Sequence, residues 1–303
     1  MSRRDAARLT ASLLVAAVVV AACGTPRSGD LGPAPTAVPS TAVAATGPPD
    51  PVPASPAAPR PAPSGTDATV RSPARSTDAS RPATVTIELW YVRAGLLAPT
   101  RRARPATVAT SRLALTELAA GPTPTEAATG MTTLLPAGVE VTRIADGVAT
   151  LGPVPAGDDP PPERRLREAQ VVWTLTQFPT VRQVRFDGGA PLGRASYTDL
   201  LPPIVVTGPV PGDRVSAPLT VTGTADVFEA TVSVRVLDAA GREVASGFGT
   251  AGCGSGCRGG YRVVVGWRTT REQRGTVEVY EVSARDGSRI NTVAVPVVLA
   301  PGP

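Results

Sequence analysis

The chain has 303 residues, a formal net charge of +5 and no histidine. Residues 1–22 carry three Arg and one Asp, and residues 24–82 carry five Arg and four Asp, so a charge of only +2 falls to the rest of the chain. So small a charge excludes the basic surface of a nucleic-acid-binding protein. The missing histidine removes the commonest general base and metal ligand, so we expect no metal, no cofactor and no enzymatic activity.

The N-terminus begins with three arginines, Arg3, Arg4 and Arg8, followed by an apolar run over residues 11–22. The run ends in small residues and a cysteine: Val20, Ala21, Ala22 and Cys23. This pattern resembles a bacterial lipoprotein signal peptide over residues 1–22. The resemblance implies that cleavage makes Cys23 the first mature residue, which receives a diacylglyceryl thioether and then a further acyl chain such as palmitate.

Two other interpretations of this segment remain. The apolar run is shorter than the roughly 20 residues that a membrane-spanning helix needs, which disfavours a retained transmembrane helix. A secreted protein with a chance cysteine is the other alternative. We expect the chain to be lipid-anchored on the outer face of the cell membrane.

Residues 23–82 begin with the lipidated cysteine and continue as a segment rich in Pro, Ala, Ser and Thr. Residues 24–82 hold 14 of the 34 prolines and show no apolar periodicity. Such a composition predicts a disordered stalk with polyproline II character. Fully extended, it reaches on the order of 180 Å. Its Ser and Thr residues beside Pro leave O-glycosylation open.

The first folded domain is predicted over residues 83–190. Val85, Ile87, Leu89 and Tyr91 alternate with more polar residues, which is the period of a half-buried strand. The later elements, in chain order, are an Arg-rich loop or short strand over 93–104, a helix over 108–120, strands over 131–135 and 139–144, a turn at 146–147, a strand over 148–151, a helix from a start near Asp159 to Pro179, and a strand over 181–186. The order β-α-β-β-α-β predicts an α+β fold with two helices on one sheet.

After a connector over residues 191–202, residues 203–300 predict strands alone. The short runs with period-two alternation cover 204–206, 215, 219–223, 232–237, 244–248, 261–267, 277–282 and 293–299. Turn signals such as Pro211-Gly212 and Asp286-Gly287 separate them. This many short strands in about 100 residues predicts an all-β immunoglobulin-like sandwich.

The first domain carries motifs that occur in a fixed order. They are Leu89-Trp90-Tyr91-Val92, Leu115-x-Glu117-Leu118-x-x-Gly121-Pro122-Thr123, Leu135-Pro136-x-Gly138, Asp146-Gly147-Val148-Ala149, Ala169-Gln170-Val171-Val172-Trp173-Thr174-Leu175-Thr176-Gln177-Phe178-Pro179 and Val184-x-Phe186. Together they resemble the GerMN domain of sporulation and germination proteins. One departure is Gly152-Pro153, which stands where the family usually has an acidic and a hydroxyl residue, so no site that depends on that pair is expected here.

The second domain resembles the immunoglobulin-like Gmad-type module that commonly follows a GerMN domain. The matching motifs are Pro209-x-Pro211-Gly212, Leu219-x-Val221-x-Gly223-x-Ala225, Val227-Phe228-Glu229-Ala230-Thr231-Val232, Gly260-Tyr261 and Glu281-x-Ser283-Ala284-x-Asp286-Gly287-Ser288. The two resemblances imply an envelope lipoprotein of the spore-germination kind. They do not imply an enzyme, and GerMN domains are similar to ring-building motifs that act through protein contacts.

Cys253 and Cys257 are left as a pair once Cys23 is assigned to lipid. Their spacing is C-x3-C, whereas redox motifs use C-x2-C, and neither a histidine nor a second cysteine pair completes a zinc site. An exported chain favours disulfides. We therefore predict a structural disulfide that closes a glycine-rich hairpin loop.

Two charged clusters have alternative interpretations. Glu229, beside Phe228, and Glu281, near Asp286, could be catalytic carboxylates, but we expect Phe228 to be a core or turn anchor and both glutamates to partner Arg residues. The basic run of Arg101, Arg102 and Arg104 is predicted to be a solvated loop, with contact to anionic wall polymer or lipid head groups as the alternative.

The sequence thus predicts a non-enzymatic module of the cell envelope. It is expected to act through an envelope protein partner or self-association, close to the membrane and in the neighbourhood of peptidoglycan. The alternative is a wall-active enzyme or a carbohydrate-binding module. Sugar binding would require exposed aromatic side chains, for which Trp90, Trp173 and Trp267 are the candidates.

Overall fold

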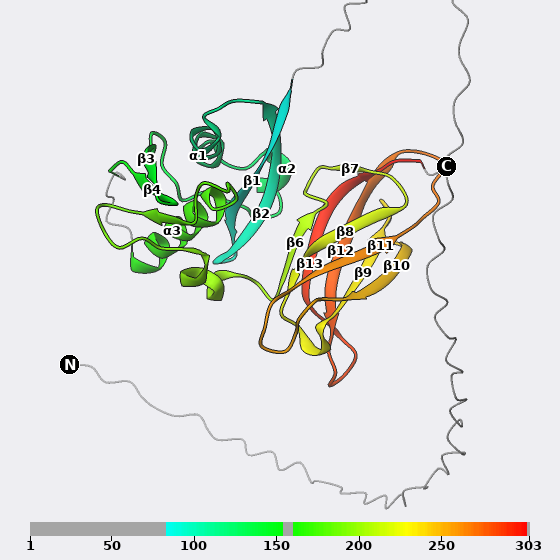
Figure 1. Cartoon of the computed structure of the whole chain (residues 1–303). Helices are drawn as coiled ribbons and strands as arrows, with labels where there is room; N and C mark the ends of the chain where they lie inside the picture. The colour runs from blue at the N-terminus through cyan, green and yellow to red at the C-terminus, as the bar shows by residue number, and fades with distance from the viewer. Residues whose placement is uncertain (1–82, 154–159, 302–303) are drawn as a thin grey trace, which may run out of the picture. The chain divides into compact units, whose positions relative to one another are not determined.

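A computed structural model of the chain describes residues 83–153 and 160–301 (Figure 1). The predicted signal peptide with Val20, Ala21, Ala22 and Cys23, the stalk over 24–82 and the predicted helix cap Asp159 lie outside the described residues. Of the helices in the described part, none is long and apolar enough to cross a membrane.

The first domain combines strands and helices. Its elements are β1 (Thr84–Arg93), β2 (Leu96–Pro105), α1 (Thr110–Ala120), α2 (Pro124–Ala127), β3 (Val141–Ala145), β4 (Val148–Leu151), α3 (Pro161–Leu175) and β5 (Gln183–Arg185). β1 pairs antiparallel with β2, while β4 pairs antiparallel with β3 and parallel with β5. The α+β class is confirmed, although the strands are divided between two sheets where one sheet was expected.

β2 is a full strand where the sequence predicted a loop or short strand. It pairs with β1 along its whole length, from Arg93 opposite Leu96 to Thr84 opposite Pro105. The two-residue connection is Ala94-Gly95, both in the left-handed region at φ 50° and 75°. Such a turn matches the twist of the two strands, but Ala at its first position is an unusual choice and hides the hairpin in the sequence.

Local sequence explains where the first helices begin and end. α1 ends at Gly121, which has a φ of 87° and is followed by a proline. The next residues form α2, which the sequence did not reveal. The Thr123 side chain accepts from the main-chain N–H of Glu126, and the Glu126 carboxylate accepts from the N–H of Thr123 at 2.7 Å. This capping box, with Pro124 at the first helical position, stabilises a helix of only four residues.

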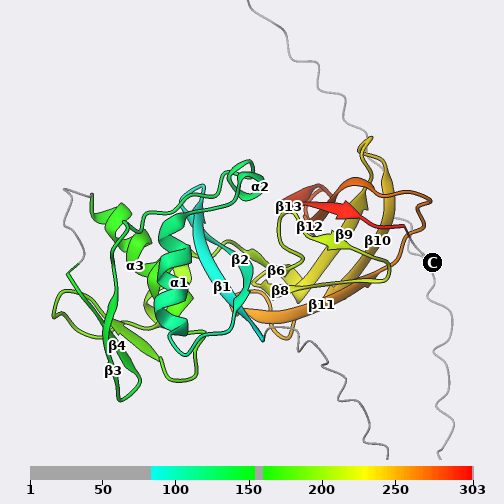
Figure 2. The ribbon, with the colours of Figure 1, turned by 90° about the horizontal axis from the view of Figure 1, so that it is seen from above.

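The core of the first domain lies where α1 and α3 pack on β1 (Figure 2). Large side chains that are fully buried there come from all three elements and from β2: Ile87, Leu89, Tyr91, Leu97, Leu115, Leu118, Val171 and Leu175. The Tyr91 hydroxyl donates to the main-chain carbonyl of Gly121 at 2.7 Å, which satisfies its polar end inside the core. Burial raises the pKa of Tyr91 to about 12.

The second domain is a β-sandwich, and the immunoglobulin-like class is confirmed. Its strands are β6 (Ile204–Gly208), β7 (Arg214–Val215), β8 (Leu219–Ala225), β9 (Thr231–Leu237), β10 (Glu243–Thr250), β11 (Gly259–Val265), β12 (Gln273–Val282) and β13 (Arg289–Leu299). One sheet has the order β10-β9-β12-β13-β7 and the other β11-β8-β6. Val232, Val234 and Val236 alternate with more exposed residues on β9 and are fully buried between the sheets.

Two motif residues of the second domain are explained by a close approach. Tyr261 on β11 lies opposite Gly223 on β8, and its hydroxyl donates to the main-chain carbonyl of Val205 at 3.1 Å. A Cβ atom at position 223 would lie 1.9 Å from that carbonyl oxygen and 2.6 Å from the Tyr261 hydroxyl. Only glycine leaves room for the tyrosine to cross β8.

Candidate functional site

The longest sequence motif of the first domain, residues 169–179, binds the α3 region to β1 through side-chain hydrogen bonds. The Gln177 side-chain oxygen accepts from the N–H of Glu88 at 2.8 Å, and its nitrogen donates to the Glu88 carbonyl at 2.7 Å. The Thr174 hydroxyl accepts from the N–H of Trp90 at 3.1 Å, and the Gln170 amide donates to the Trp90 carbonyl at 3.0 Å. We call this set of contacts the α3–β1 seam. Its side chains form hydrogen bonds with the main-chain N–H and C=O groups on the outer edge of β1, where a neighbouring strand would ordinarily lie.

The α3–β1 seam also explains a wrong prediction. Residues 131–135 were expected to be a strand, but only Thr132 pairs with β1, through two main-chain hydrogen bonds with Val92. The N–H of Leu134 instead donates to the side-chain oxygen of Gln170 at 2.9 Å. Gln170 therefore lies between the backbones of Trp90 and Leu134, and its hydrogen bonds replace the main-chain hydrogen bonds that a strand would have formed there.

The connector over residues 191–202 packs on α3. The Arg194 guanidinium lies over the Trp173 ring, 4.5 Å from its centroid, and donates to the Thr176 hydroxyl at 2.8 Å. Burial lowers the pKa of Arg194, and the nearby carboxylate of Glu88 opposes that shift. Further along, the Tyr197 hydroxyl donates to the Glu168 carboxylate at 2.9 Å. Arg194 and Tyr197 thus pack the connector against α3.

The tryptophans do not form a sugar-binding surface. Trp90 is 3% exposed and Trp267 is 5% exposed. Trp173 is half-buried and is covered by Trp90, with ring centroids 4.6 Å apart, and by Arg194. The three aromatic candidates for carbohydrate binding are therefore used in packing.

The basic run in β2 is not a free cationic loop. Arg102 forms a buried ion pair with Glu126, and Arg104 pairs with Glu117 at 2.6 Å. Thr100 also donates to the Glu126 carboxylate. Burial would raise the pKa of Glu126, but hydrogen bonds from Arg102, Thr100 and the N–H of Thr123 outweigh it and hold the pKa below its ordinary value. The prediction of a solvated loop is wrong for Arg102, because its charge stabilises α2 against β2.

Two of the three candidate carboxylates, Glu281 and Asp286, have structural partners, whereas the Glu229 carboxylate has no ion pair with an Arg among the described residues, so the partner expected for it is not found. Glu281 accepts from the N–H of Phe228 at 3.0 Å and from the Asn291 amide at 2.7 Å, so the expected Arg partner is wrong. Phe228 lies in the one-turn helix η2 (Phe228–Ala230) and is 52% exposed, so it is a turn residue and not part of the core. Asp286 accepts from Ser288 within its turn, which lowers its pKa to about 2.

Cys253 and Cys257 are joined by a disulfide, with their Cα atoms 5.6 Å apart. The loop that they close lies against the turn before β9. The N–H of Ser255 donates to the carbonyl of Val227 at 3.0 Å, and the N–H of Gly256 donates to the Asp226 carboxylate at 2.8 Å. The disulfide loop thus holds the approach to β11 against the neighbouring turn.

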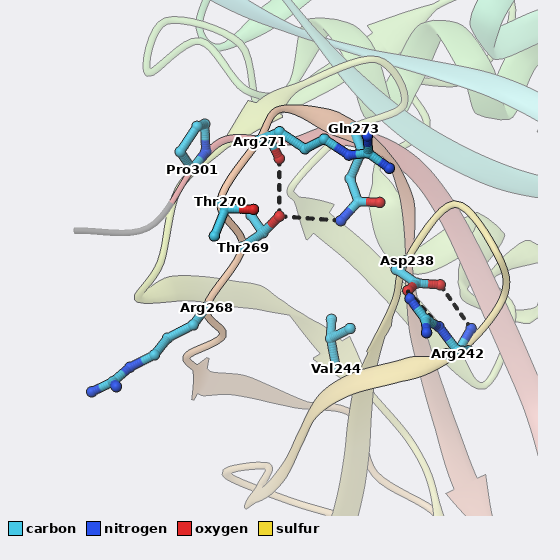
Figure 3. A pocket seen from close by; sticks show the side chains of 9 residues that line it. All are labelled: Asp238, Arg242, Val244, Arg268, Thr269, Thr270, Arg271, Gln273 and Pro301. Carbon is cyan, nitrogen blue, oxygen red and sulfur yellow. Dashed lines mark hydrogen bonds and ion pairs between the residues drawn. The ribbon is translucent and has the colours of Figure 1, made fainter.

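A surface pocket of about 660 Å³ opens at the end of the sandwich where β9 turns into β10 and β11 leads into β12 (Figure 3). Its lining residues are Asp238, Arg242, Val244, Arg268, Thr269, Thr270, Arg271, Gln273 and Pro301. No sequence motif marked this pocket. The only signal is Arg268-Thr269-Thr270-Arg271, a polar loop with two cations between two buried strands.

Hydrogen bonds shape both walls of this pocket. Asp238 accepts from the N–H groups of Ala240 and Arg242, each at 2.9 Å, and from the Arg242 guanidinium at 2.7 and 2.9 Å. The Arg242 side chain is the main cause that lowers the pKa of Asp238. On the other wall, the Gln273 amide donates to the Thr269 hydroxyl, which donates to the carbonyl of Arg271. This arrangement can bind an anion, while the described residues offer no group of three or more potential metal ligands.

Comparison with known proteins agrees with the motifs. Residues 88–189 match the Germane family model, described as "Sporulation and spore germination". Residues 203–288 match the Gmad2 model, described as "Immunoglobulin-like domain of bacterial spore germination". The resemblances of the two folded domains to GerMN and Gmad-type domains are confirmed. No curated protein sequence matches the chain.

Solved structures similar to the chain include the first GerMN domain of the sporulation protein GerM from Bacillus subtilis. It is 24% identical, with 37% of this chain and 96% of that chain covered and a TM-score of 0.29. The tandem GerMN domains of the same protein are 19% identical, with 55% of this chain and 60% of that chain covered and a TM-score of 0.30. CopC from Methylosinus trichosporium OB3b is 17% identical, with 32% and 94% covered and a TM-score of 0.22. The two family-model matches show that the chain carries a sporulation and spore germination domain of the Germane family followed by an immunoglobulin-like domain of the Gmad2 family.

Proposed function

We propose that the protein is a lipid-anchored, non-enzymatic module of the cell envelope that acts through contacts with another envelope protein or with a second copy of itself. The pairing of a Germane domain with a Gmad2 domain supports a role related to sporulation or germination. The small residues before Cys23 and the proline-rich segment after it support an anchor with a stalk on the outer face of the membrane.

The observation that carries the contact role is a pair of exposed apolar side chains on two neighbouring strands, β10 and β11. β10 is the last strand of its sheet, and in the described part of the chain its outer side makes no main-chain ladder. Phe248 on this strand is 76% exposed, and Val264 on the neighbouring β11 is 55% exposed. β11 lies along the outer side of β10, so the outward-facing apolar side chains are what the two strands leave exposed, and exposed apolar side chains of this kind are typical of a binding surface.

Cys23→Ser tests the anchor. The variant should leave the membrane fraction and appear in the soluble extracytoplasmic fraction, while its thermal unfolding stays unchanged because the substitution precedes both folded domains. Continued sedimentation of this variant with membranes after a salt wash would contradict the anchor.

A photocross-linking amino acid at position 248 tests the contact role in cells. We expect a discrete covalent adduct at this position and none at Val108, an even more exposed apolar position just before α1. An adduct of twice the chain mass would identify self-association, and a heterologous adduct would identify an envelope partner. Equal patterns at both positions, together with peptidoglycan hydrolysis by the purified chain, would contradict the proposal.

A further inference from the structure

The pocket at the end of the second domain holds an excess of positive charge. Three of its lining residues are arginines, Arg242, Arg268 and Arg271, and one is a carboxylate, Asp238. Arg242 is neutralised by Asp238, which is itself buried and fully engaged. The side chains of Arg268 and Arg271 make no hydrogen bond or ion pair with any residue that the structure describes, so two positive charges remain.

Neighbouring acids do not compensate these two charges. Glu272 follows Arg271 directly, but its carboxylate pairs with the Nε atom of Arg214 at 2.6 Å. Glu243, next to Arg242, lies 3.8 Å from the guanidinium of Arg235. The nearest carboxylates along both walls are therefore used in ion pairs of their own.

The pocket is also organised before any ligand binds. Asp238 fixes the direction of the Arg242 guanidinium through two hydrogen bonds. On the opposite loop, the hydrogen bonds from Gln273 to Thr269 and from Thr269 to the Arg271 carbonyl hold the backbone in place (Figure 3). Arg268 extends away from the other two guanidiniums in Figure 3. Its exposed and unpaired side chain is free to rotate toward an ion at the mouth of the pocket.

We propose that this pocket binds a phosphate group. Arginine presents a planar fork of donors that matches two oxygens of a phosphate, and hydroxyl groups supply further donors. Thr270 offers such a hydroxyl beside the two unpaired arginines. A phosphate monoester carries about −1.5 to −2 at pH 7, which matches the two positive charges better than a single carboxylate does. The recognised chemistry is thus a phosphate dianion.

This chemistry has two possible sources, a soluble phosphate compound and a lipid head group. Inorganic phosphate serves as the probe for the first. Vesicles of phosphatidylcholine with phosphatidic acid, whose phosphate is a monoester, serve for the second, and vesicles of phosphatidylcholine alone are their control. All arms use the full chain with Cys23→Ser, so that an acyl anchor cannot carry the protein onto the vesicles.

The test compares two double variants that lose the same charge. Arg268→Gln with Arg271→Gln removes the two unpaired guanidiniums of the pocket. Arg143→Gln with Arg164→Gln removes two exposed arginines of the first domain and is the matched control. Calorimetric titration with inorganic phosphate should show about tenfold weaker binding, or more, for the pocket variant, equivalent to about 1.4 kcal/mol. The control variant should bind as the unaltered chain does.

A pH series sharpens the test. Inorganic phosphate gains its second negative charge near neutral pH, so its binding should strengthen between pH 5.5 and pH 8, whereas sulfate, a dianion throughout, should show no such change. The charged groups that face the site are Asp238, Arg242, Arg268 and Arg271, and Asp238 has a lowered pKa. Sulfate keeps its charge over the whole series, so a change seen with phosphate alone would report on the ligand.

The outcomes separate clearly. Loss of phosphate binding in the pocket variant alone supports the proposal. Binding to phosphatidic acid vesicles that is lost in the same variant, without binding of free phosphate, also supports it and assigns the lipid source. Equal weakening in both double variants would show a response to net charge and would overturn the proposal, as would the absence of saturable binding to either probe. Neither result depends on the contact at Phe248 or the anchor at Cys23.

Discussion

The side-chain amide of Gln170 donates to the main-chain carbonyl of Trp90 at 3.0 Å while its oxygen accepts from the N–H of Leu134 at 2.9 Å. One helix residue thereby joins a strand to a loop that are 44 residues apart (from 90 to 134) in the sequence. Gln170 is fully buried, so both main-chain groups depend on it for their hydrogen bonds. This relationship leads to the first prediction.

Gln170→Met keeps a side chain of similar length but removes both hydrogen bonds. An unsatisfied buried polar group costs about 1–3 kcal/mol, so the free energy of unfolding should fall by about 3 kcal/mol in urea titrations. Arg164→Gln on the exposed face of the same helix is the control and should change it by less than about 0.5 kcal/mol. If the unaltered chain, Gln170→Met and Arg164→Gln had equal urea midpoints, the α3–β1 seam would contribute nothing to the free energy of unfolding.

Acid should weaken the first domain through Glu126. Because its pKa in the folded chain lies below the ordinary value of 4.5, its stabilising effect is complete above that value and is lost as the pH falls through the folded pKa. Glu126→Gln should lower the free energy of unfolding by about 3 kcal/mol at pH 7, because it leaves Arg102 buried without its partner.

The same variant checks the pH dependence. Urea titrations between pH 7 and pH 3 should give a shallower loss of stability for Glu126→Gln than for the unaltered chain. Some slope will remain, since Asp199, Asp238 and Asp286 also have lowered pKa values. Identical slopes would mean that Glu126 is not the group responsible.

Gly223→Ala should destabilise the second domain. The added methyl group would meet the Val205 carbonyl and the Tyr261 hydroxyl, which forces β6 or β11 to move and costs about 3 kcal/mol. Tyr261→Phe, which only removes one hydrogen bond, should cost about 1 kcal/mol. Differential scanning calorimetry should order the melting temperatures as unaltered, Tyr261→Phe and Gly223→Ala. A Gly223→Ala variant with the melting temperature of the unaltered chain would refute the close approach of Tyr261 and the Val205 carbonyl to Gly223.

The Cys253–Cys257 disulfide should leave neither of these two cysteines free in the folded chain. Alkylation followed by mass spectrometry should detect both cysteines only after reduction. Cys253→Ser with Cys257→Ser should lower the free energy of unfolding by about 2 kcal/mol, the chain-entropy value for so short a loop. Stoichiometric labelling without reduction would contradict the disulfide.

Elements with strong local signals were predictable from the sequence, and those made by distant contacts were not. The alternation in β9 and the helical spacing of Leu115 and Leu118 predict buried faces that the structure confirms. The sequence does not reveal that Gln170 would satisfy the N–H of Leu134, so a strand was predicted where tertiary hydrogen bonds prevail. β2 was predicted only as a loop or short strand, because its run of buried residues from Leu97 to Thr100 and the arginines that follow show no clear period of two.

The candidate pocket was not predictable for a related reason. Asp238 and Arg271 are 33 positions apart, and only the pairing of β9 with β12 brings their turns to one end of the sandwich. The most conspicuous motif residues, such as Trp90 and Trp173, pack inside the first domain and do not form a site.

The connector on α3 extends the cooperative unit of the first domain beyond the residues that its family model matches. Tyr197 is 2% exposed and Leu201 is 7% exposed, and both belong to the same core as α3. A fragment cut at residue 190 would lose these side chains and the cover that Arg194 gives Trp173. Limited proteolysis should therefore release a stable N-terminal fragment only when the cut falls after Leu201, and fragments that end earlier should be degraded further.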